Sequence, residues 1–214
     1  QIVAVVEDIA PSAIKIGMLA NKEVAIIVAD ALSRYNIPTI LDPVMVSSSG
    51  HRLLSLDAQE VVKERLLPLS TLVTPNIPEM EALTAMSLTT AEEKLSAAQY
   101  LLSLGTQAVL LKGGHEEGDT KCDTLYELDG SNITQLHLST PTVATKNIHG
   151  TGCTLSSAIA AFMARGLALR EAVQEAKNYI TEAILSGADI AIGNGFGPVN
   201  HLFNPLPMQV YEER

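Results

Sequence analysis

Short apolar segments alternate with helical patterns along most of this chain of 214 residues. Strand-like segments at 13–19, 37–41, 71–74 and 108–111 are separated by stretches in which apolar residues recur every three or four positions. Parallel strands need long crossover connections, which are usually helices. The alternation therefore predicts a mainly parallel sheet with helices on both faces, as one α/β domain over residues 1–214.

Capping residues and glycines mark where several helices begin and end. Asn21 can cap a helix that runs to about Tyr35. Thr90 and Glu93 have the spacing of a capping box, for a helix that ends at Gly105. The other helical patterns lie at 2–9, 57–67 (ended by Pro68), 79–83, 151–165 and 170–186.

A second pattern interrupts the alternation between residues 124 and 138. Thr124–Leu128 and Ile133–Leu138 flank the dipeptide Asp129-Gly130, which is typical of a β-hairpin turn. We expect this hairpin to extend an edge of the sheet rather than to form a separate domain.

Charge and cysteine content exclude several classes of protein. The formal net charge is −10, from 14 Lys+Arg and 24 Asp+Glu, so we expect no nucleic-acid partner, because such surfaces need basic patches. The longest apolar run, 158–164, is far shorter than the ~18 residues of a membrane span. Two cysteines are too few for a disulfide framework. With no signal peptide visible, we expect a cytoplasmic protein without membrane partners.

Polar residues follow three of the predicted strands directly. Asp42 follows the second strand, Asn76 with Glu79 follows the third, and Lys112 follows the fourth. Ligands of open α/β sheets bind beyond the carboxyl ends of the strands, and Mg²⁺ prefers one or two carboxylates together with phosphate oxygens. The set predicts a metal-phosphate site, although any one of these residues could be polar only because strand ends meet solvent.

Gly150, Thr151 and Gly152 stand immediately before a helical pattern. Glycines let the backbone approach a ligand closely, and the free N–H groups at a helix start favour an anion. No Gly-Lys-Ser/Thr follows, which excludes a Walker loop, and Leu155 takes the third glycine position of the dinucleotide fingerprint. The segment is an oxyanion or phosphate cradle, or simply a tight helix start.

Cys153 follows the cradle directly. The pKa of a thiol falls at a helix N-terminus or beside cations, so we expect a thiolate that can accept a proton from a substrate hydroxyl. The alternative is a small packing residue. A zinc site with His149 is disfavoured because the region offers too few ligands.

Six segments in this order resemble the hydroxymethylpyrimidine/phosphomethylpyrimidine kinases of thiamine biosynthesis, within the ribokinase-like superfamily. The resemblance covers nearly the whole chain and implies a ribokinase-like fold. The segments are Lys15–Leu19, Leu41–Met45, Thr74–Glu79, Leu111–His115, Lys146–Thr154 and Gly193–Pro198.

The resemblance implies an ATP-dependent kinase. Its first acceptor is the hydroxymethyl group of 4-amino-5-hydroxymethyl-2-methylpyrimidine, and its second is the resulting monophosphate. Under it, Cys153 is the base and Gly150, Thr151 and Gly152 form the anion hole, while Lys112 neutralises phosphate charge. A homodimer is likewise implied by the resemblance alone.

The same resemblance assigns the remaining site residues. Asn76 binds ATP together with Lys112 and the anion hole, and it organises Mg²⁺ with Asp42 and Glu79. Met18 and Val44 contact the pyrimidine. Residues 47–50 are similar to a mobile flap over the site.

Two alternatives stay open at this point. Family members begin with a strand and a glycine-rich substrate loop, whereas this chain starts at Gln1 in a helical pattern, so we expect the N-terminal part of the fold to be absent. A pyridoxal or pyridoxine kinase with the same Gly-Thr-Gly-Cys segment is therefore the main alternative. A binding or regulatory protein that keeps the fold without catalysis is disfavoured by the presence of Asp42, Glu79, Lys112 and Cys153.

Overall fold

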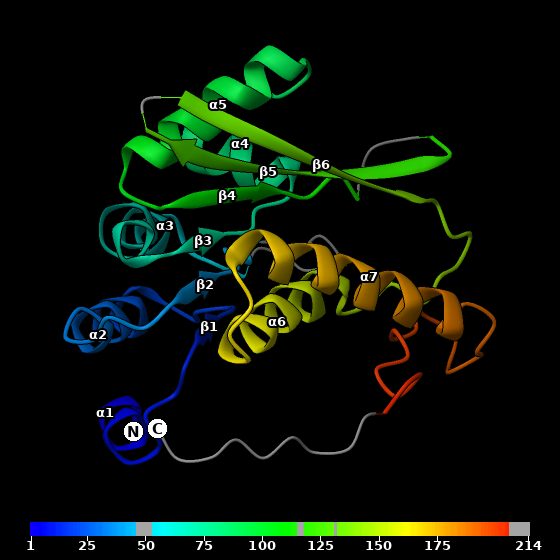
Figure 1. The fold of residues 1–214 in the computed structure, drawn as a ribbon, viewed down its shortest axis with the longest axis horizontal. Helices are drawn as coiled ribbons and strands as arrows, with labels where there is room; N and C mark the ends of the chain where they lie inside the picture. Colours follow the sequence, from blue (N-terminus) through cyan, green and yellow to red (C-terminus); the bar gives the residue numbers. More distant parts are fainter. Residues whose placement is uncertain (46–52, 115–117, 131, 206–214) are drawn as a thin grey trace.

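The computed structural model describes residues 1–45, 53–114, 118–130 and 132–205, and they build a six-stranded sheet (Figure 1). The strand order is β1-β2-β3-β4-β5-β6. The first four strands pair in parallel, and β5 and β6 continue the sheet in antiparallel pairing. The strands are β1 (Ile14–Ile16), β2 (Thr39–Leu41), β3 (Leu72–Val73), β4 (Ala108–Leu111), β5 (Thr120–Asp129) and β6 (Asn132–Pro141).

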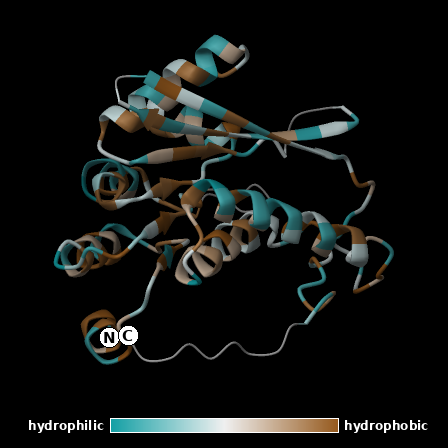
Figure 2. Cartoon of the chain, viewed as in Figure 1, coloured by the Kyte–Doolittle hydropathy of each residue, from teal (hydrophilic) through white to brown (hydrophobic). Residues whose placement is uncertain are grey.

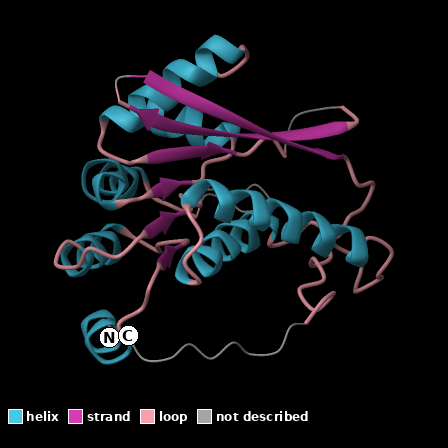
Figure 3. Cartoon of the chain, in the orientation of Figure 1, coloured by secondary structure: helices cyan, strands magenta, loops and turns pink. Residues whose placement is uncertain are grey.

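Helices cover both faces of the sheet, as the sequence predicts (Figures 1 and 3). One face carries the helices that precede or connect the parallel strands, and the other carries the two last helices. The first group is α1 (Ile2–Ile9), α2 (Lys22–Leu32), α3 (Leu56–Val61), α4 (Ile77–Thr84) and α5 (Ala91–Ser103). The second group is α6 (Thr151–Ala164) and α7 (Leu169–Gly187).

The sheet separates two hydrophobic cores. Successive side chains of a strand point to opposite faces, so each buried strand contributes to both cores. In Figure 2 the central strands are accordingly hydrophobic, while the outer face of α7 is hydrophilic. Leu41, Val73 and Leu111 pack under the connecting helices. Ile40, Leu72 and Leu110 pack under α6 and α7.

The capping residues act as the sequence predicts. The side chain of Asn21 accepts a hydrogen bond from the N–H of Val24 at 2.9 Å. Thr90 and Glu93 form a reciprocal capping box at the start of α5, and Gly105 has the positive φ of 111° that follows many helices. The helix that Asn21 caps ends at Leu32, three residues before the predicted end.

Residues 56–69 form three consecutive helical segments. After α3, residues Val62–Leu66 are π-helical (η1) and Leu67–Leu69 form a 3₁₀ turn (η2). The prediction of a single helix that Pro68 ends is therefore wrong. Pro68 lies in the first turn of η2, where the fixed φ of proline suits the helix and its missing N–H is not needed.

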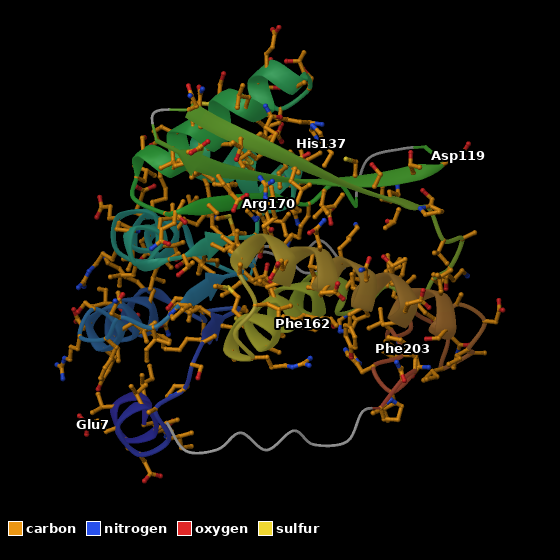
Figure 4. The ribbon with its side chains drawn as sticks, viewed as in Figure 1. Glu7, Asp119, His137, Phe162, Arg170 and Phe203 are labelled. Atoms are coloured by element: carbon orange, nitrogen blue, oxygen red, sulfur yellow. The ribbon has the colours of Figure 1, made fainter. Side chains whose placement is uncertain are left out.

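The hairpin does extend the sheet edge, because β4 pairs with β5 over Ala108–Leu111. Each hairpin strand has ten residues, which is longer than the apolar alternation indicated. Exposed polar residues occupy both ends of the hairpin strands, so the apolar alternation did not extend far enough to predict their full length. Arg170 of α7 donates to Glu127 of β5 at 3.0 Å (Figure 4).

No helix within the described residues has the length and apolar character needed to cross a membrane.

Candidate active site

Strand alternation brings three polar side chains to the α6 side of the sheet. Asp42, Thr74 and Lys112 each stand two positions after a strand residue of the α6 core and directly after one of the opposite core. They therefore point toward α6 from the carboxyl ends of adjacent strands. An isolated parallel bridge between Asn76 and Lys112 continues the pairing of β3 and β4 past the strand ends.

Asp42 is the centre of this cluster, with only 1% of its surface exposed. Its Oδ1 accepts from Lys112 Nζ at 2.9 Å and from Thr74 Oγ1 at 3.3 Å. Its Oδ2 accepts from Ser156 Oγ of α6 at 3.1 Å. Lys15 Nζ lies 3.9 Å from the same Oδ2. The carboxylate is thereby fixed by groups from three strands or strand ends and one helix.

Lys112 connects the two buried carboxylates. Its Nζ lies 3.6 Å from Glu79 Oε2 in addition to the contact with Asp42. Burial alone would lower the pKa of Lys112, but the negative charges of Asp42 and Glu79 outweigh it and the pKa is raised. Burial raises the pKa of Glu79, and the charge of Lys112 opposes that shift. Lys112 is therefore protonated at neutral pH, and its ammonium lies between the carboxylates of Asp42 and Glu79.

Asn76 and Glu79 also have a structural role that the sequence reading did not assign. Asn76 Oδ1 accepts from the N–H of Glu79 at 2.8 Å, and Glu79 Oε2 accepts from the N–H of Asn76 at 2.8 Å. This reciprocal pair is a capping box at the start of α4. The cap fixes the Glu79 side chain in the orientation that directs Oε2 toward Lys112.

The glycine segment before α6 has the geometry of an anion cradle. Gly150 is the N-cap of α6 with φ 84°, a conformation that favours glycine. A Cβ on Gly152 would lie 3.2 Å from Lys112 Nζ, so the ammonium rests against the first turn of α6. Within the described residues, the N–H groups of Gly152 and Cys153 have no hydrogen-bond acceptor. Thr151 Oγ1 is engaged, because it donates to the carbonyl of Ile148 at 2.6 Å.

Cys153 lies in the first turn of α6 and keeps exposed surface. It adjoins a hollow of about 610 Å³ that extends along α6 to Phe162, which Figure 4 labels. Partial burial and the charge of Asp42 raise the pKa of the thiol, while Lys15 and Lys112 act in the opposite direction. The expectation of a lowered pKa is therefore wrong for the protein without ligands, because partial burial of the thiol and the nearby Asp42 carboxylate both disfavour the thiolate.

Three residues that contact Asp42 were missed by the sequence reasoning: Thr74, which ends the third predicted strand, and Lys15 and Ser156, which lie inside apolar elements. Lys15 is a lysine between two isoleucines of β1, and Ser156 is a fully buried serine in an apolar helix. A polar residue that interrupts an apolar pattern was the available signal. Its meaning depends on Asp42, which is 27 and 114 residues away in the sequence and cannot be placed by local periodicity.

Met18 and Val44 lie near the same edge, because Ile16 of β1 pairs with Leu41 of β2. Met18 is exposed and Val44 is half-buried. Both are therefore placed where they could contact a ligand beyond the strand ends. The proposed flap at 47–50 lies outside the described residues.

The last motif, 193–198, is joined to the cradle by backbone pairing. The N–H of His149 donates to the carbonyl of Gly197 at 3.0 Å, and His149 forms a bridge with Pro198. The buried Asn147 donates to the carbonyl of Gly187 at 2.7 Å. The position of the cradle therefore depends on the end of α7 and the segment that follows it.

Solved structures with this fold include several vitamin kinases. A phosphomethylpyrimidine kinase from Clostridium difficile superposes with a TM-score of 0.71 at 38% identity, over 86% of this chain and 73% of that chain. The pyridoxal kinase from Staphylococcus aureus in complex with AMP-PCP and pyridoxal has a TM-score of 0.80 at 32% identity, over 94% of this chain and 71% of that chain. The fold and these neighbours define a ribokinase-like kinase.

The sequence comparisons resolve the family within that class. The model of the phosphomethylpyrimidine kinase family matches residues 1–200, and the chain belongs to this family. It is 41% identical over 202 residues to the hydroxymethylpyrimidine/phosphomethylpyrimidine kinase of Rhizobium meliloti, covering 94% of this chain and 74% of that one. It is 44% identical over 203 residues to a bifunctional thiamine biosynthesis protein of Geobacter sulfurreducens, of which it spans 40% while 94% of this chain is covered.

Proposed function

We propose that this protein transfers the γ-phosphoryl group of ATP to 4-amino-5-hydroxymethyl-2-methylpyrimidine and then to the resulting monophosphate. The observation that carries the proposal is the contact between Lys112 and the cradle, since a Cβ on Gly152 would lie 3.2 Å from the ammonium. A cation and free N–H groups thus converge where a transferring phosphoryl group needs stabilisation. The names of the similar kinases support the choice of acceptor.

In the first transfer, the bond between the γ-phosphorus and the bridging oxygen of ATP breaks, and a bond from that phosphorus to the hydroxymethyl oxygen forms. The hydroxyl proton passes to the Cys153 thiolate, and ADP leaves. The N–H groups of Gly152 and Cys153, together with Lys112, stabilise the charge on the transferring group. Because the pKa of the Cys153 thiol is raised, the thiolate is scarce at neutral pH, and this step speeds up as the pH rises.

Asp42 and Glu79 fit a magnesium ion at this edge of the sheet. They are two oxygen donors on either side of the Lys112 ammonium, at 2.9 Å and 3.6 Å, so the site already favours positive charge between them. Mg²⁺ takes one or two protein carboxylates and completes its shell with phosphate oxygens and water. When bound, it would neutralise the phosphate oxygens of ATP. Asn76 orients Glu79 for this contact through the capping box.

The test is an assay of the purified full-length protein with ATP, Mg²⁺ and the hydroxymethylpyrimidine, with both phosphorylated products followed by chromatography. We expect monophosphate first and diphosphate later. Chelation of divalent ions should abolish both, and Glu79→Gln should raise the Mg²⁺ concentration needed for half-maximal rate by about tenfold. Formation of neither product would refute the proposal.

A pyridoxal kinase is the second candidate, and a specific observation favours it. The superposition on the Staphylococcus aureus pyridoxal kinase has the higher TM-score, 0.80 against 0.71, although the identity is lower, 32% against 38%. We give more weight to identity, because one fold hosts several acceptors while side chains decide among them. Competition between the pyrimidine and pyridoxal, each at equal concentration, decides the question by the ratio of the two kcat/KM values.

We further propose that residues 1–214 act as a single kinase unit in the cytoplasm, as a homodimer, with only small molecules as substrates. The net charge of −10 and the absence of a spanning helix among the described residues are compatible with this setting. Sedimentation at micromolar concentration tests the dimer, and a monomer there would refute it.

A further inference from the structure

Lys15 brings a second ammonium group to the cluster around Asp42. The neighbours Ile14 and Ile16 pack toward the connecting helices, so strand alternation directs Lys15 to the α6 side. Its side chain is 19% exposed and its Nζ lies 3.9 Å from Asp42 Oδ2. Its Nζ would be 2.6 Å from a Cβ on Gly17, so the glycine provides the space that the ammonium occupies. The position thus requires both residues.

The contact with Asp42 does not account for this lysine. At 3.9 Å the pair is too long for a hydrogen bond, and within the described residues no other acceptor contacts the Lys15 ammonium. Asp42 accepts hydrogen bonds from Lys112, Thr74 and Ser156, so its position does not depend on Lys15. The three N–H donors of Lys15 are therefore available for an acceptor that the described part of the chain does not supply.

Lys15 and Lys112 approach the cluster from the two ends of the parallel set, because Lys15 lies in β1 and Lys112 directly follows β4. Lys112 lies against the glycine of the α6 first turn, and Lys15 lies against the glycine that precedes Met18. Both ammonium groups are close enough to the Cys153 thiol to lower its pKa, against the larger effect of burial. One cation thus faces the cradle, while the other faces the end of β1, where Met18 is exposed.

We propose that Lys15 binds the phosphate of the monophosphate acceptor and thereby allows the second phosphorylation. The proposal rests on the proposed function and concerns the substrate of the same site. The second acceptor carries negative charge toward Asp42 and the phosphates of ATP, and the first acceptor is neutral. A second cation, separate from the one at the cradle, is what this difference in charge requires.

The chemistry of the second transfer makes the requirement specific. The bond from the γ-phosphorus to the bridging oxygen of ATP breaks, and a bond from that phosphorus to an oxygen of the monophosphate forms, with ADP as the leaving group. That acceptor oxygen is already ionised, so no proton has to be removed. The first step therefore depends on Cys153 as base, and the second depends on neutralisation of the acceptor by Lys15.

The experiment compares Lys15→Met, Lys15→Arg and Lys63→Met in the full-length protein. Lys63 is a matched control, because its side chain is 23% exposed and its Nζ lies 3.9 Å from Glu60 on the opposite side of the sheet from α6. For each variant, kcat/KM is measured with the hydroxymethylpyrimidine and, separately, with the monophosphate. Calorimetry without nucleotide gives the affinity for each acceptor, and thermal melting confirms folding.

We expect the ratio of the kcat/KM for the monophosphate to that for the alcohol to fall by about 10- to 100-fold in Lys15→Met, the size of a lost charge-assisted hydrogen bond. The affinity for the monophosphate should fall by a similar factor, and Lys15→Arg should restore most of both. Lys63→Met should leave the ratio unchanged. Equal losses on the two acceptors, or no loss of affinity for the monophosphate, would overturn the role of Lys15. Failure of the proposed function is distinct, because the unmodified protein would then phosphorylate neither acceptor.

Discussion

The substitution Lys112→Met gives the sharpest test of how the site is held together. It removes the ammonium that lies 2.9 Å from Asp42 Oδ1 and 3.6 Å from Glu79 Oε2, and it keeps a side chain of similar length. Both carboxylates are buried, with exposed fractions of 1% and 5%. The variant therefore leaves two negative charges together in the interior.

The expected loss of stability follows from these distances. At an effective dielectric constant of about 20, the two attractions amount to about 10 kcal/mol, and the desolvation of the ions offsets more than half of this. Removal of one partner from a buried pair typically costs about 3–5 kcal/mol. Asp42 keeps the hydroxyl donors of Thr74 and Ser156, so we expect the lower end, about 3 kcal/mol. That corresponds to about 6–12 °C in melting temperature for a chain of this size.

The loss should depend on pH in a defined direction. Burial raises the pKa of Glu79 and the Lys112 charge opposes it, so removal of Lys112 raises this pKa further. A carboxyl whose pKa is higher in the folded state binds protons preferentially there, so the folded state gains stability as the pH falls toward that pKa. The deficit of Lys112→Met should therefore be largest near about pH 8 and should shrink toward about pH 5.

Urea denaturation of the metal-free protein at both pH values measures the effect, with Lys63→Met as the control. The double variant Lys112→Met/Glu79→Gln should recover part of the stability at the higher pH, because it removes one of the unpaired charges. A deficit below about 1 kcal/mol, or one that is equal at both pH values and unaffected by Glu79→Gln, would refute the electrostatic argument.

Three further predictions concern Cys153, Asn147 and Lys177. In a Cys122→Ser background, alkylation of Cys153 without ligands should titrate with a pKa above the ordinary thiol value, and a pKa below it would contradict the effect assigned to burial and Asp42. Asn147→Ala removes three donated bonds to carbonyls at and after the end of α7, two short ones at 2.7 Å and 2.6 Å and one at 3.5 Å, and should cost about 2–3 kcal/mol in urea denaturation. Lys177→Met removes the ammonium that lies 2.8 Å from the buried Asp123 and leaves that carboxylate only the N–H of Gly113, so it should cost about 3 kcal/mol, and an unchanged melting temperature would refute that pairing.

The fold could be predicted from the sequence because its determinants are local. Most parallel strands are short apolar runs, and three helices begin at side-chain caps, provided by Asn21, Asn76 and Thr90. The geometry of 56–69 could not be predicted, because a π-helical turn differs from an α-helical one by the hydrogen-bond pairing of the backbone and leaves the apolar spacing nearly unchanged.

The candidate site was predictable where topology alone brings residues together. Asp42, Glu79 and Lys112 follow consecutive parallel strands, so the sheet places them at one edge and the structure joins them by ion pairs. The direction of the Cys153 pKa shift was not predictable, because it depends first on the burial of the thiol and then on the charge of Asp42, which is distant in the sequence. A helix start alone indicated the opposite shift.

The alternation that builds the two cores also explains why this edge of the sheet is charged. Leu41 and Leu111 bury one face against the connecting helices, so Asp42 and Lys112, one residue further along, must point into the space under α6. The start of α6 supplies no large apolar side chain to fill that space, because the N-cap is Gly150 and the first turn opens with Thr151, Gly152 and Cys153. The glycines leave room for a ligand beside the free N–H groups of the first turn of α6. The ion pairs allow charged side chains to remain buried at the base of this space. The arrangement proposed to bind phosphate is therefore also the one that makes the buried charges tolerable, so stability and activity should respond together to changes at Lys112 and separately to changes at Lys15.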